Sequence, residues 1–152
     1  MLEGPLQQGA IMIWGTFALA FAAAFTGASF YVNWVEQPAR LKLEDAALLS
    51  EWGPSDSRGV SLLVALALVS AIAGFIAYFD TQDVRWAFGA VIIIGSWLYA
   101  FFVMSPLDNQ VRSLRGGDIG AARALVRQWG IVESGLTAIG AVAVLVFLWA
   151  HH

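Results

Sequence analysis

The chain has 152 residues, of which 59% are hydrophobic and 12% are charged, and it carries a formal net charge of −3 and no cysteine. Soluble globular domains contain about 25% charged residues. This composition therefore excludes a soluble globular domain and indicates a single membrane domain over residues 1–150. The lack of cysteine excludes disulfides, thiolate nucleophiles and cysteine-ligated metal sites.

Four uncharged runs divide the chain. They cover residues 4–35, 59–79, 86–107 and 134–150, with lengths of 32, 21, 22 and 17 residues. A helix needs about 20 apolar residues to cross a hydrocarbon core, and a segment in lipid must satisfy its own backbone hydrogen bonds. The sequence therefore predicts an all-α integral membrane four-helix bundle with up-down topology and helices at about 10–32, 59–79, 84–104 and 131–150. We expect contact with membrane lipid and no nucleic-acid partner.

The two chain ends carry no expected function. The first uncharged run is too long for a signal-peptide core, so we expect it to be retained. His151 and His152 are the only histidines, and we interpret them as the remnant of a purification tag.

Basic residues gather in two of the three connections between the expected helices. The connection 33–58 holds Arg40, Lys42 and Arg58, the connection 105–130 holds Arg112, Arg115, Arg123 and Arg127, and only Arg85 lies on the other side. By the positive-inside rule, we expect loops 33–58 and 105–130 in the cytoplasm and both termini outside.

The first helix leads into the segment YVNWVEQPAR, from Tyr31 to Arg40, where an uncharged run gives way to polar groups. Pro38 lacks a backbone N–H and disfavours helical geometry in the residue before it, so we expect a break or kink there. Earlier in the helix, small residues recur at every fourth position and favour close helix packing, as in Ala20, Ala24 and Ala28.

A short amphipathic segment follows at about residues 39–52, and we expect it to lie along the membrane interface. Gly53-Pro54 is expected to end this segment. The second helix would then be capped by one of three side chains, Ser55, Asp56 or Ser57.

The second half of the chain follows a similar plan. The short turn between Asp80 and Asp83 predicts that the helices it joins are antiparallel neighbours. Pro106 is expected to break the third helix, and Asp118 to cap a second amphipathic interfacial segment. Gly130 ends that segment, so that Glu133 falls in the first turn of the fourth helix.

The two halves can be aligned as an internal repeat. Superposing Arg40 on Arg112 places Glu36 on Asp108, and Trp52-Gly53 later matches Trp129-Gly130. Each half holds an even number of crossings, so a repeat would bring both polar breaks to the same membrane face. Chance similarity between two helical hairpins is the alternative.

The polar breaks provide the candidate site. The candidate catalytic acids are Glu36, Asp108 and Glu133, and the candidate substrate-binding residues are Asn33, Gln37, Arg40, Trp52, Asn109, Arg112 and Trp129. Polar groups at membrane depth are costly unless they serve a function, and each acid at position i with an arginine at i+4 can form an ion pair. The tryptophans would form the rim of the pocket. The alternative is an ordinary interface, with snorkelling arginines and a tryptophan belt.

Several site types are not expected. No charged residue lies near the middle of a crossing, which argues against an ion pump, a proton relay or a voltage sensor. No histidine lies inside the bilayer to bind haem, copper or iron. We therefore expect no metal and no cofactor.

Three short motifs resemble one family. At YVNWVEQPAR, at Trp-Gly-Pro-Ser from Trp52 to Ser55, and at the Pro-x-x-Asn-x-x-x-x-Leu pattern that starts at Pro106, the chain is similar to the anthrone-oxygenase-like family of small four-helix membrane proteins. Most bacterial members have no assigned function. The resemblance covers nearly the whole chain and implies a bacterial inner-membrane location. The family often has a histidine where Gln37 stands here.

The resemblance implies cofactor-independent oxidation of a hydrophobic aromatic such as an anthrone or a quinol-like compound. An acid among Glu36, Asp108 and Glu133 would act as base, and Arg40, Arg112 or Asn109 would hold the developing oxyanion. The alternative is a non-catalytic protein, either an accessory subunit of a larger membrane complex or a binder of lipid or quinone. A homo-oligomer is compatible with both.

Overall fold

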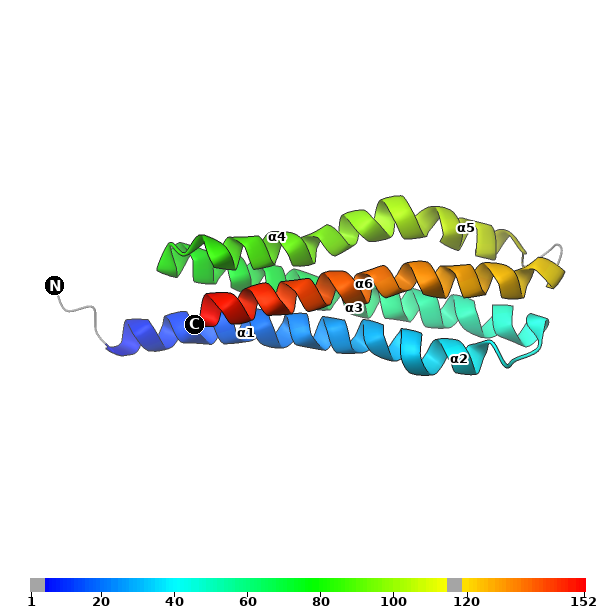
Figure 1. Ribbon diagram of the computed structural model, residues 1–152, viewed down its shortest axis with the longest axis horizontal. Coiled ribbons are helices and arrows are strands. Elements are labelled where there is room, and N and C mark those ends of the chain that lie inside the picture. Colours follow the sequence, from blue (N-terminus) through cyan, green and yellow to red (C-terminus); the bar gives the residue numbers. More distant parts are fainter. Residues whose placement is uncertain (1–4, 115–118) are drawn as a thin grey trace.

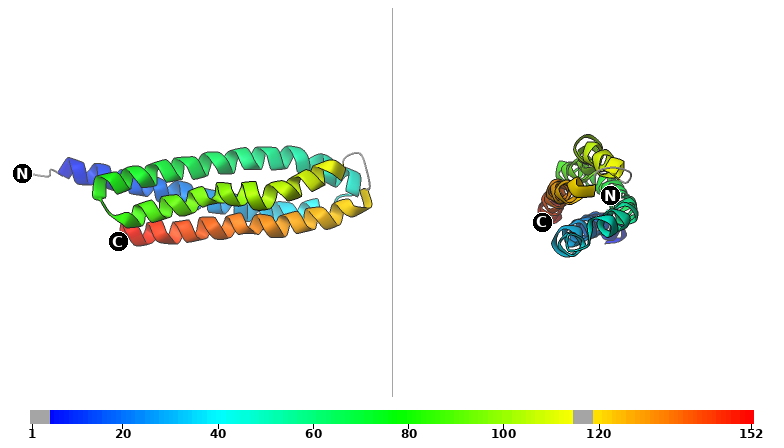
Figure 2. Two further views of the ribbon diagram at one scale, coloured as in Figure 1. Left: turned by 90° about the horizontal axis from the view of Figure 1, so that it is seen from above. Right: turned by 90° about the vertical axis from the view of Figure 1, so that its right-hand side faces the viewer.

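The structure is a computed structural model that describes residues 5–114 and 119–152, with side chains for residues 13–114 and 120–152. Long helical stretches lie side by side along one axis, and the start of α1 lies at the same end of the bundle as the C-terminus (Figures 1 and 2). Within the described ranges four stretches are long and apolar enough to cross a membrane, namely Ile13–Arg40, Asp45–Thr81, Val84–Ser113 and Ala122–His151. The predicted all-α integral membrane four-helix bundle is confirmed.

The first stretch continues through Pro38 without a break. It consists of α1 (Pro5–Tyr31), the π-helix η1 (Val32–Glu36) and α2 (Gln37–Arg40). In η1 the backbone N–H of Gln37 donates to the carbonyl of Val32, five residues back. The wider turn brings Pro38 into the first turn of α2, where its missing N–H breaks no regular helical hydrogen bond. Of the predicted break or kink, the break is therefore wrong, and a π-helical turn lies immediately before Gln37-Pro38.

The third stretch also has a π-helical turn before a proline. It consists of α4 (Val84–Tyr99), the π-helix η2 (Ala100–Met104) and α5 (Ser105–Ser113). The N–H of Ser105 donates to the carbonyl of Ala100, and Pro106 lies in the first turn of α5. The third helix therefore continues past Pro106, in contrast to the prediction.

The second stretch is the single helix α3 (Asp45–Thr81), with Pro54 in its interior. At 37 residues it is about 55 Å long, well beyond a hydrocarbon core of about 30 Å. Leu48, Leu49 and Trp52 are buried, so the apolar face of the expected interfacial segment packs into the bundle and does not lie on the membrane. The expected stop at Gly53-Pro54 and the cap at residues 55–57 are therefore wrong.

The fourth stretch is α6 (Ala122–His151), preceded by the short 3₁₀ turn η4 (Ile119–Ala121). Gly130 lies inside α6 and does not end a segment, because residues on both sides of it pack into the bundle. Glu133 is correspondingly an interior residue of α6 and not part of its first turn. Asp118, which was expected to cap a segment, lies outside the described residues, and so does Arg115. The predicted loops 33–58 and 105–130 are thus largely helical.

The turn between α3 and α4 is short, and the two helices are packed neighbours, as predicted. Gln82 adopts a left-handed conformation with φ of 57° and donates its N–H to the carbonyl of Tyr78 at 2.7 Å. Asp83 caps α4 by accepting from the N–H of Arg85 at 3.0 Å. The hydrogen bond from the Arg85 side chain lowers the pKa of Asp83.

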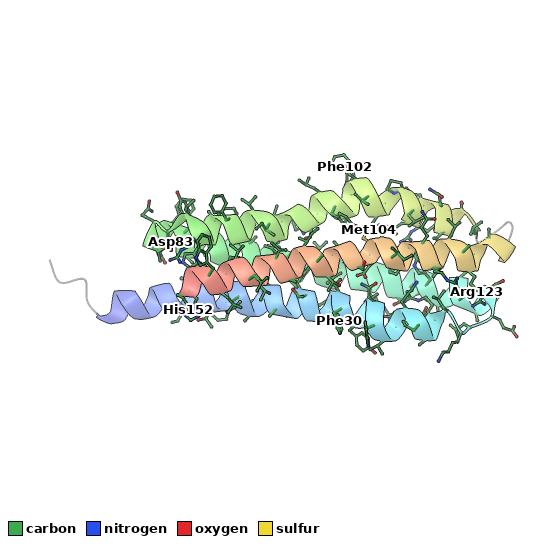
Figure 3. The ribbon with its side chains drawn as sticks, in the orientation of Figure 1. Phe30, Asp83, Phe102, Met104, Arg123 and His152 are labelled. Carbon is green, nitrogen blue, oxygen red and sulfur yellow. The ribbon has the colours of Figure 1, made fainter. Side chains whose placement is uncertain are left out.

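Small and aromatic side chains fill the bundle between the helices. Ala18, Ala22 and Phe25 of α1 are buried, whereas Ala20 and Ala24 of the expected packing stripe are exposed on the outside. Phe30 and Phe102 also lie on the outside (Figure 3). This outward apolar surface is what a protein that faces lipid requires.

Candidate functional site

Polar side chains gather inside one end of the bundle, which we name the polar end. It is the end at which α2 leads into α3 and α5 leads toward α6, opposite the start of α1 (Figures 1 and 3). The residues involved come from the last turn of α1, η1, α2, the first turns of α3, α5 and α6 as far as its middle. All four helical stretches therefore contribute to it.

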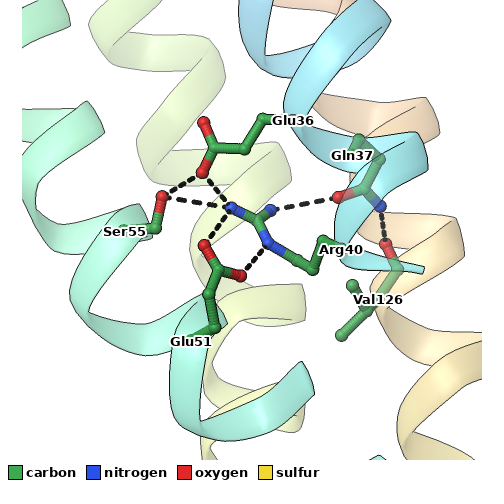
Figure 4. Close-up of polar contacts among 6 residues, drawn as sticks. All are labelled: Glu36, Gln37, Arg40, Glu51, Ser55 and Val126. Atoms are coloured by element: carbon green, nitrogen blue, oxygen red, sulfur yellow. Dashed lines mark hydrogen bonds and ion pairs between the residues drawn. The ribbon is translucent and has the colours of Figure 1, made fainter. Parts of the chain in front are cut away.

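Arg40 is the centre of the polar end, and its side chain is only 1% exposed. Nε donates to Glu51 at 2.5 Å, Nη1 donates to Gln37 at 3.0 Å, and Nη2 donates to Ser55 at 3.1 Å (Figure 4). Nη2 also forms the predicted ion pair with Glu36, four residues earlier. A buried guanidinium is tolerated only with such partners, so this network fixes α2 against α3.

Gln37 joins α2 to α6. Its side-chain oxygen accepts from Arg40, and its Nε2 donates to the backbone carbonyl of Val126 at 2.6 Å (Figure 4). Gly130 lies directly against it, since a Cβ on that residue would lie 2.5 Å from Gln37 Nε2. Both ends of the amide are occupied, and the side chain is buried. Gln37 therefore serves as a bridge between helices.

A second ion pair differs from the one expected. Arg112 pairs with Asp56 of α3 at 2.6 Å and not with Asp108, four residues earlier. Asp108 instead accepts a hydrogen bond from the indole Nε1 of Trp129 at 2.7 Å. The prediction of an Asp108–Arg112 ion pair is wrong because the side chain of Arg112 turns toward α3, where the carboxylate of Asp56 is buried.

Trp52 and Trp129 form the centre of the packing between the two arginines. Their rings meet edge to face at 5.8 Å with an interplanar angle of 89°. Arg40 lies over Trp129 at 5.6 Å and Arg112 over Trp52 at 5.4 Å, so each half of the chain stacks its arginine on the tryptophan of the other. Both tryptophans are buried, at 0% and 3% exposure. They are not the exposed rim that we expected, because α3 and α6 pass straight through the Trp-Gly positions and turn both indoles inward.

Glu133 lies deeper in the bundle and has its own partners. Ser29 donates to its Oε1 at 3.0 Å, and Asn33 donates to its Oε2. Thr137 extends the group through Ser29, with 2.7 Å between the two hydroxyl oxygens. Glu133 is only 2% exposed, and both of its oxygens are hydrogen-bonded. These contacts connect α6 to α1 and η1.

Asn109 is the one predicted site residue that the structure places elsewhere. It is exposed on α5 and forms no hydrogen bond with another described residue. Its neighbour Asp108 faces inward, and a side chain one position along a helix points about 100° away. Asn109 therefore takes no part in the polar end.

A groove opens on the outside of the bundle beside Glu36, between η1 and α3. Its volume is about 570 Å³. One end is lined by polar side chains and the rest mainly by apolar ones, with the full lining Ala28, Tyr31, Val32, Glu36, Glu51, Pro54, Ser55, Arg58, Gly59, Leu62 and Leu63. Arg58 is exposed at this groove and has no ion pair among the described residues. We name it the η1–α3 groove.

A small chamber of about 50 Å³ lies behind the groove, inside the bundle. It shares part of its wall with the groove, including Glu36 and Ser55, and it is also lined by Arg40, Asp56, Trp129 and Glu133. A third cavity, of about 400 Å³, lies between α3 and η2 and reaches Asp108. The chamber and the groove therefore adjoin at Glu36 and Ser55.

Several residues of the polar end were not among the predicted ones. They are Ser29, Glu51, Ser55, Asp56, Arg58 and Thr137. Asp56 stands four residues after Trp52, as Glu133 does after Trp129, and this spacing was a signal available in the sequence. Ser29 and Thr137 had no such signal, because single hydroxyl residues are common in packed membrane helices.

No group of three or more acidic or histidine side chains in the described part of the chain is arranged to hold a metal ion. The arrangement offers hydrogen-bond donation by guanidinium groups and proton transfer through carboxylates.

Comparison of the chain with family models, with curated proteins and with solved structures found no match.

Proposed function

We propose that this protein, as a relative of the anthrone-oxygenase-like family, binds a membrane-soluble aromatic in the η1–α3 groove and catalyses its oxidation by dioxygen without a cofactor. The observation that carries this proposal is the position of Glu36. Its Oε1 is held by Arg40 and Ser55, while its Oε2 has no partner and Glu36 lines the groove (Figure 4). A carboxylate fixed through one oxygen and free at the other is suited to accept a proton.

The groove also has the size and lining that such a substrate requires. Its volume of about 570 Å³ lies within the range of about 300–1,000 Å³ of small-molecule sites. Leu62, Leu63 and Val32 offer apolar contacts to rings, and Glu36, Ser55 and Arg58 offer polar ones. A flat aromatic with one polar edge would enter sideways from the lipid.

Glu36 is a better candidate for the base than the other two acids. Both oxygens of Glu133 are already hydrogen-bonded, to Ser29 and Asn33. Asp108 accepts from Trp129 and lines a different cavity, the one between α3 and η2. Of the three, Glu36 alone lines the η1–α3 groove.

With an anthrone as substrate, the proposed reaction balances with dioxygen as the only oxidant. Glu36 takes a proton from the carbon opposite the carbonyl group, and the electron pair remains on the ring system as an enolate. The enolate carbon bonds to dioxygen, and the resulting peroxide takes up the proton. Loss of water leaves a second carbonyl, so that one oxygen atom enters the quinone and the other leaves as water.

Arg58 is the candidate for stabilising the enolate oxygen. All three nitrogen atoms of Arg40 already donate to protein groups, which leaves little for a ligand. Arg58 lines the same groove and has no ion pair in the described structure. A guanidinium in the same groove as the base can hold the negative charge that develops during proton removal.

Oxygen uptake tests this proposal. Purified protein with anthrone should consume dioxygen faster than the buffer background, and Glu36→Gln should lower that rate by about 10²–10⁴-fold, the usual contribution of a general base. Asp80→Asn, at the opposite end of the bundle, is the matched control and should keep the wild-type rate. Equal rates in Glu36→Gln and wild type would count against the proposal.

A non-catalytic role is the second candidate. The specific observation in its favour is the exposed small-residue face of α1, where Ala20, Ala23 and Ala24 point outward and a Cβ on Gly27 would meet nothing within 4 Å. Such a face permits close packing with a helix of a second copy or of a larger membrane complex. Stoichiometric co-purification with a larger complex, together with no oxygen uptake, would favour this role.

We propose further that the protein lies in a bacterial inner membrane with the polar end toward the cytoplasm and both termini outside. The distribution of arginines supports this orientation, since Arg58, Arg112 and Arg123 all lie toward the polar end.

We also propose that the two halves arose by duplication. The reciprocal stacking of Arg40 on Trp129 and of Arg112 on Trp52 supports that origin.

A further inference from the structure

The chamber behind the η1–α3 groove is too small for a ring and large enough for one substituent. Its volume of about 50 Å³ compares with about 30 Å³ for a water molecule in the liquid. Val32, Glu36, Ser55, Gly59 and Leu63 line both the chamber and the groove. A ligand whose ring lies in the groove can therefore place one hydroxyl-sized group in the chamber.

Nearly all side-chain donors on the chamber wall are already in use. Arg40 donates from all three nitrogen atoms, to Glu51, Gln37, Glu36 and Ser55. The hydroxyl of Ser55 donates to Glu36. The indole N–H of Trp129 donates to Asp108 at 2.7 Å. A ligand group that enters the chamber therefore finds at most one free side-chain donor among the described lining residues, the second N–H of Arg40 Nη1.

Two acceptors on the same wall are free. Oδ1 of Asp56 is buried without a hydrogen-bond partner, and the residue is 5% exposed. Oε2 of Glu36 also has no partner (Figure 4). The other oxygen of each carboxylate is ion-paired, with Arg112 for Asp56 and with Arg40 for Glu36, and an ionised carboxylate only accepts hydrogen bonds.

We infer that the chamber selects ligands by redox state: it binds the hydroxyl group of a reduced aromatic, such as a phenol or hydroquinone, and rejects the carbonyl oxygen of the corresponding quinone. A hydroxyl donates to Asp56 or Glu36, and charge-assisted hydrogen bonds of this kind are the strong ones. A quinone carbonyl can only accept, so it would place its oxygen against two carboxylate oxygens. The inference rests on the proposed function for the position of the ring in the groove.

This selectivity has a consequence for turnover. Oxidation turns a C–H or O–H group that faces the carboxylates into a carbonyl that they repel. The product would therefore bind more weakly than the substrate and leave the groove toward the lipid. Discrimination of this kind is strong when a mismatch leaves buried polar groups unpaired.

Calorimetric titration under anaerobic conditions tests the inference, because no turnover occurs without dioxygen. The probes are 1,4-dihydroxynaphthalene and 1,4-naphthoquinone, which share a ring and differ in donor capacity. The chain has no cysteine, so the quinone has no thiol to alkylate. We expect the dihydroxy compound to bind at least about tenfold more tightly to wild type. Equal affinities, or tighter binding of the quinone, would overturn the inference.

The variants Asp56→Asn and Glu36→Gln localise the effect, since a carboxamide can donate to a carbonyl. Each variant should raise the affinity for naphthoquinone and reduce the preference for the dihydroxy compound over the quinone by about tenfold. Asp80→Asn, at the opposite end of α3, should keep the wild-type ratio. An unchanged ratio in both of the first two variants would refute the assignment to these carboxylates.

A comparison on wild type alone needs no variant that could misfold. 1-Naphthol should bind about tenfold more tightly than 1-methoxynaphthalene, which has the same ring and no donor. Equal affinities for the two compounds would overturn the inference.

Failure of the proposed function would give a different result from failure of this inference. If neither the reduced nor the oxidised probe binds, the groove is not the ligand-binding site and both proposals fail. If the two probes bind equally well, only the inference of redox selection fails.

Discussion

Arg40 shows how a charge can be buried at the end of a membrane bundle. Its side chain is 1% exposed, and it contacts Glu36, Gln37, Glu51 and Ser55. A buried guanidinium without hydrogen-bond partners would destabilise the folded state. Each partner of Arg40 therefore stabilises the folded state. The same network keeps one oxygen of Glu36 occupied and leaves the other free.

Trp129 allows this reasoning to be tested on a single hydrogen bond. Trp129→Phe keeps the aromatic packing against Trp52 and removes the N–H that donates to Asp108 at 2.7 Å. The carboxylate would lose its donor, so we expect a loss of about 1–3 kcal/mol in the free energy of unfolding. The measurement is an equilibrium unfolding titration in mixed micelles.

Trp34→Phe is the matched control, because Trp34 is 72% exposed on the outside of the bundle. It should change the free energy of unfolding by less than about 0.5 kcal/mol. If both variants lose the same amount, the Trp129–Asp108 hydrogen bond does not contribute what its burial implies.

Local spacing predicted some of these contacts and missed others. The Glu36–Arg40 ion pair follows from an i,i+4 spacing within one helical stretch. The same spacing wrongly indicated a pair between Asp108 and Arg112, because the partner of Arg112 is Asp56, on another helix. Contacts between helices depend on the rotation of each helix about its axis, which a single sequence does not give.

At the level of elements, the two π-helices explain why both prolines are accommodated. η1 ends at Glu36, immediately before Gln37-Pro38, and η2 ends at Met104, immediately before Ser105-Pro106. The rule that proline breaks a helix assumes α-helical register on its N-terminal side. A π-turn changes that register by one residue, and the helix continues. The sequence rules identified both positions, but the break expected at Pro106 and the break expected as one outcome at Pro38 do not occur.

Gly130 of α6 provides a prediction at this scale. Gly130→Ala would bring a Cβ to 2.5 Å from Gln37 Nε2, which is itself fixed by the Val126 carbonyl. We expect α2 and α6 to separate slightly and the free energy of unfolding to fall by about 1–3 kcal/mol. Melting temperature and unfolding titration both report this change.

Gly27→Ala is the corresponding control, since a Cβ there meets nothing within 4 Å. It should be neutral or raise stability by up to about 1 kcal/mol through helix propensity. Greater destabilisation by Gly27→Ala than by Gly130→Ala would contradict the close approach of Gln37 to α6.

For the molecule as a whole, the fold could be predicted because the bilayer imposes it. Uncharged runs of about 20 residues must form helices in lipid, and each of the four runs falls in a different one of the four spanning stretches. The helix ends were not predictable in the same way. Outside the hydrocarbon core, local stop signals such as Gly53-Pro54 competed with packing of Leu48 and Trp52, and packing decided the structure.

The orientation of the bundle gives a prediction at this scale. α1 begins and α6 ends at the end of the bundle opposite the polar end. A reporter that is active only outside the cytoplasm should be active when fused after residue 150 and inactive when inserted between Lys42 and Glu44. The reverse pattern would place the polar end outside.

The central claim is that Glu36 removes a proton from an aromatic substrate in the η1–α3 groove, and this step can be observed without dioxygen. Anaerobic exchange of the acidic C–H protons of anthrone in D₂O can be followed by proton NMR with purified protein. Wild type and Asp80→Asn should accelerate the exchange over background, and Glu36→Gln should lower that acceleration by about 10²-fold or more. Exchange at the background rate in wild type, or equal acceleration by Glu36→Gln, would contradict the account.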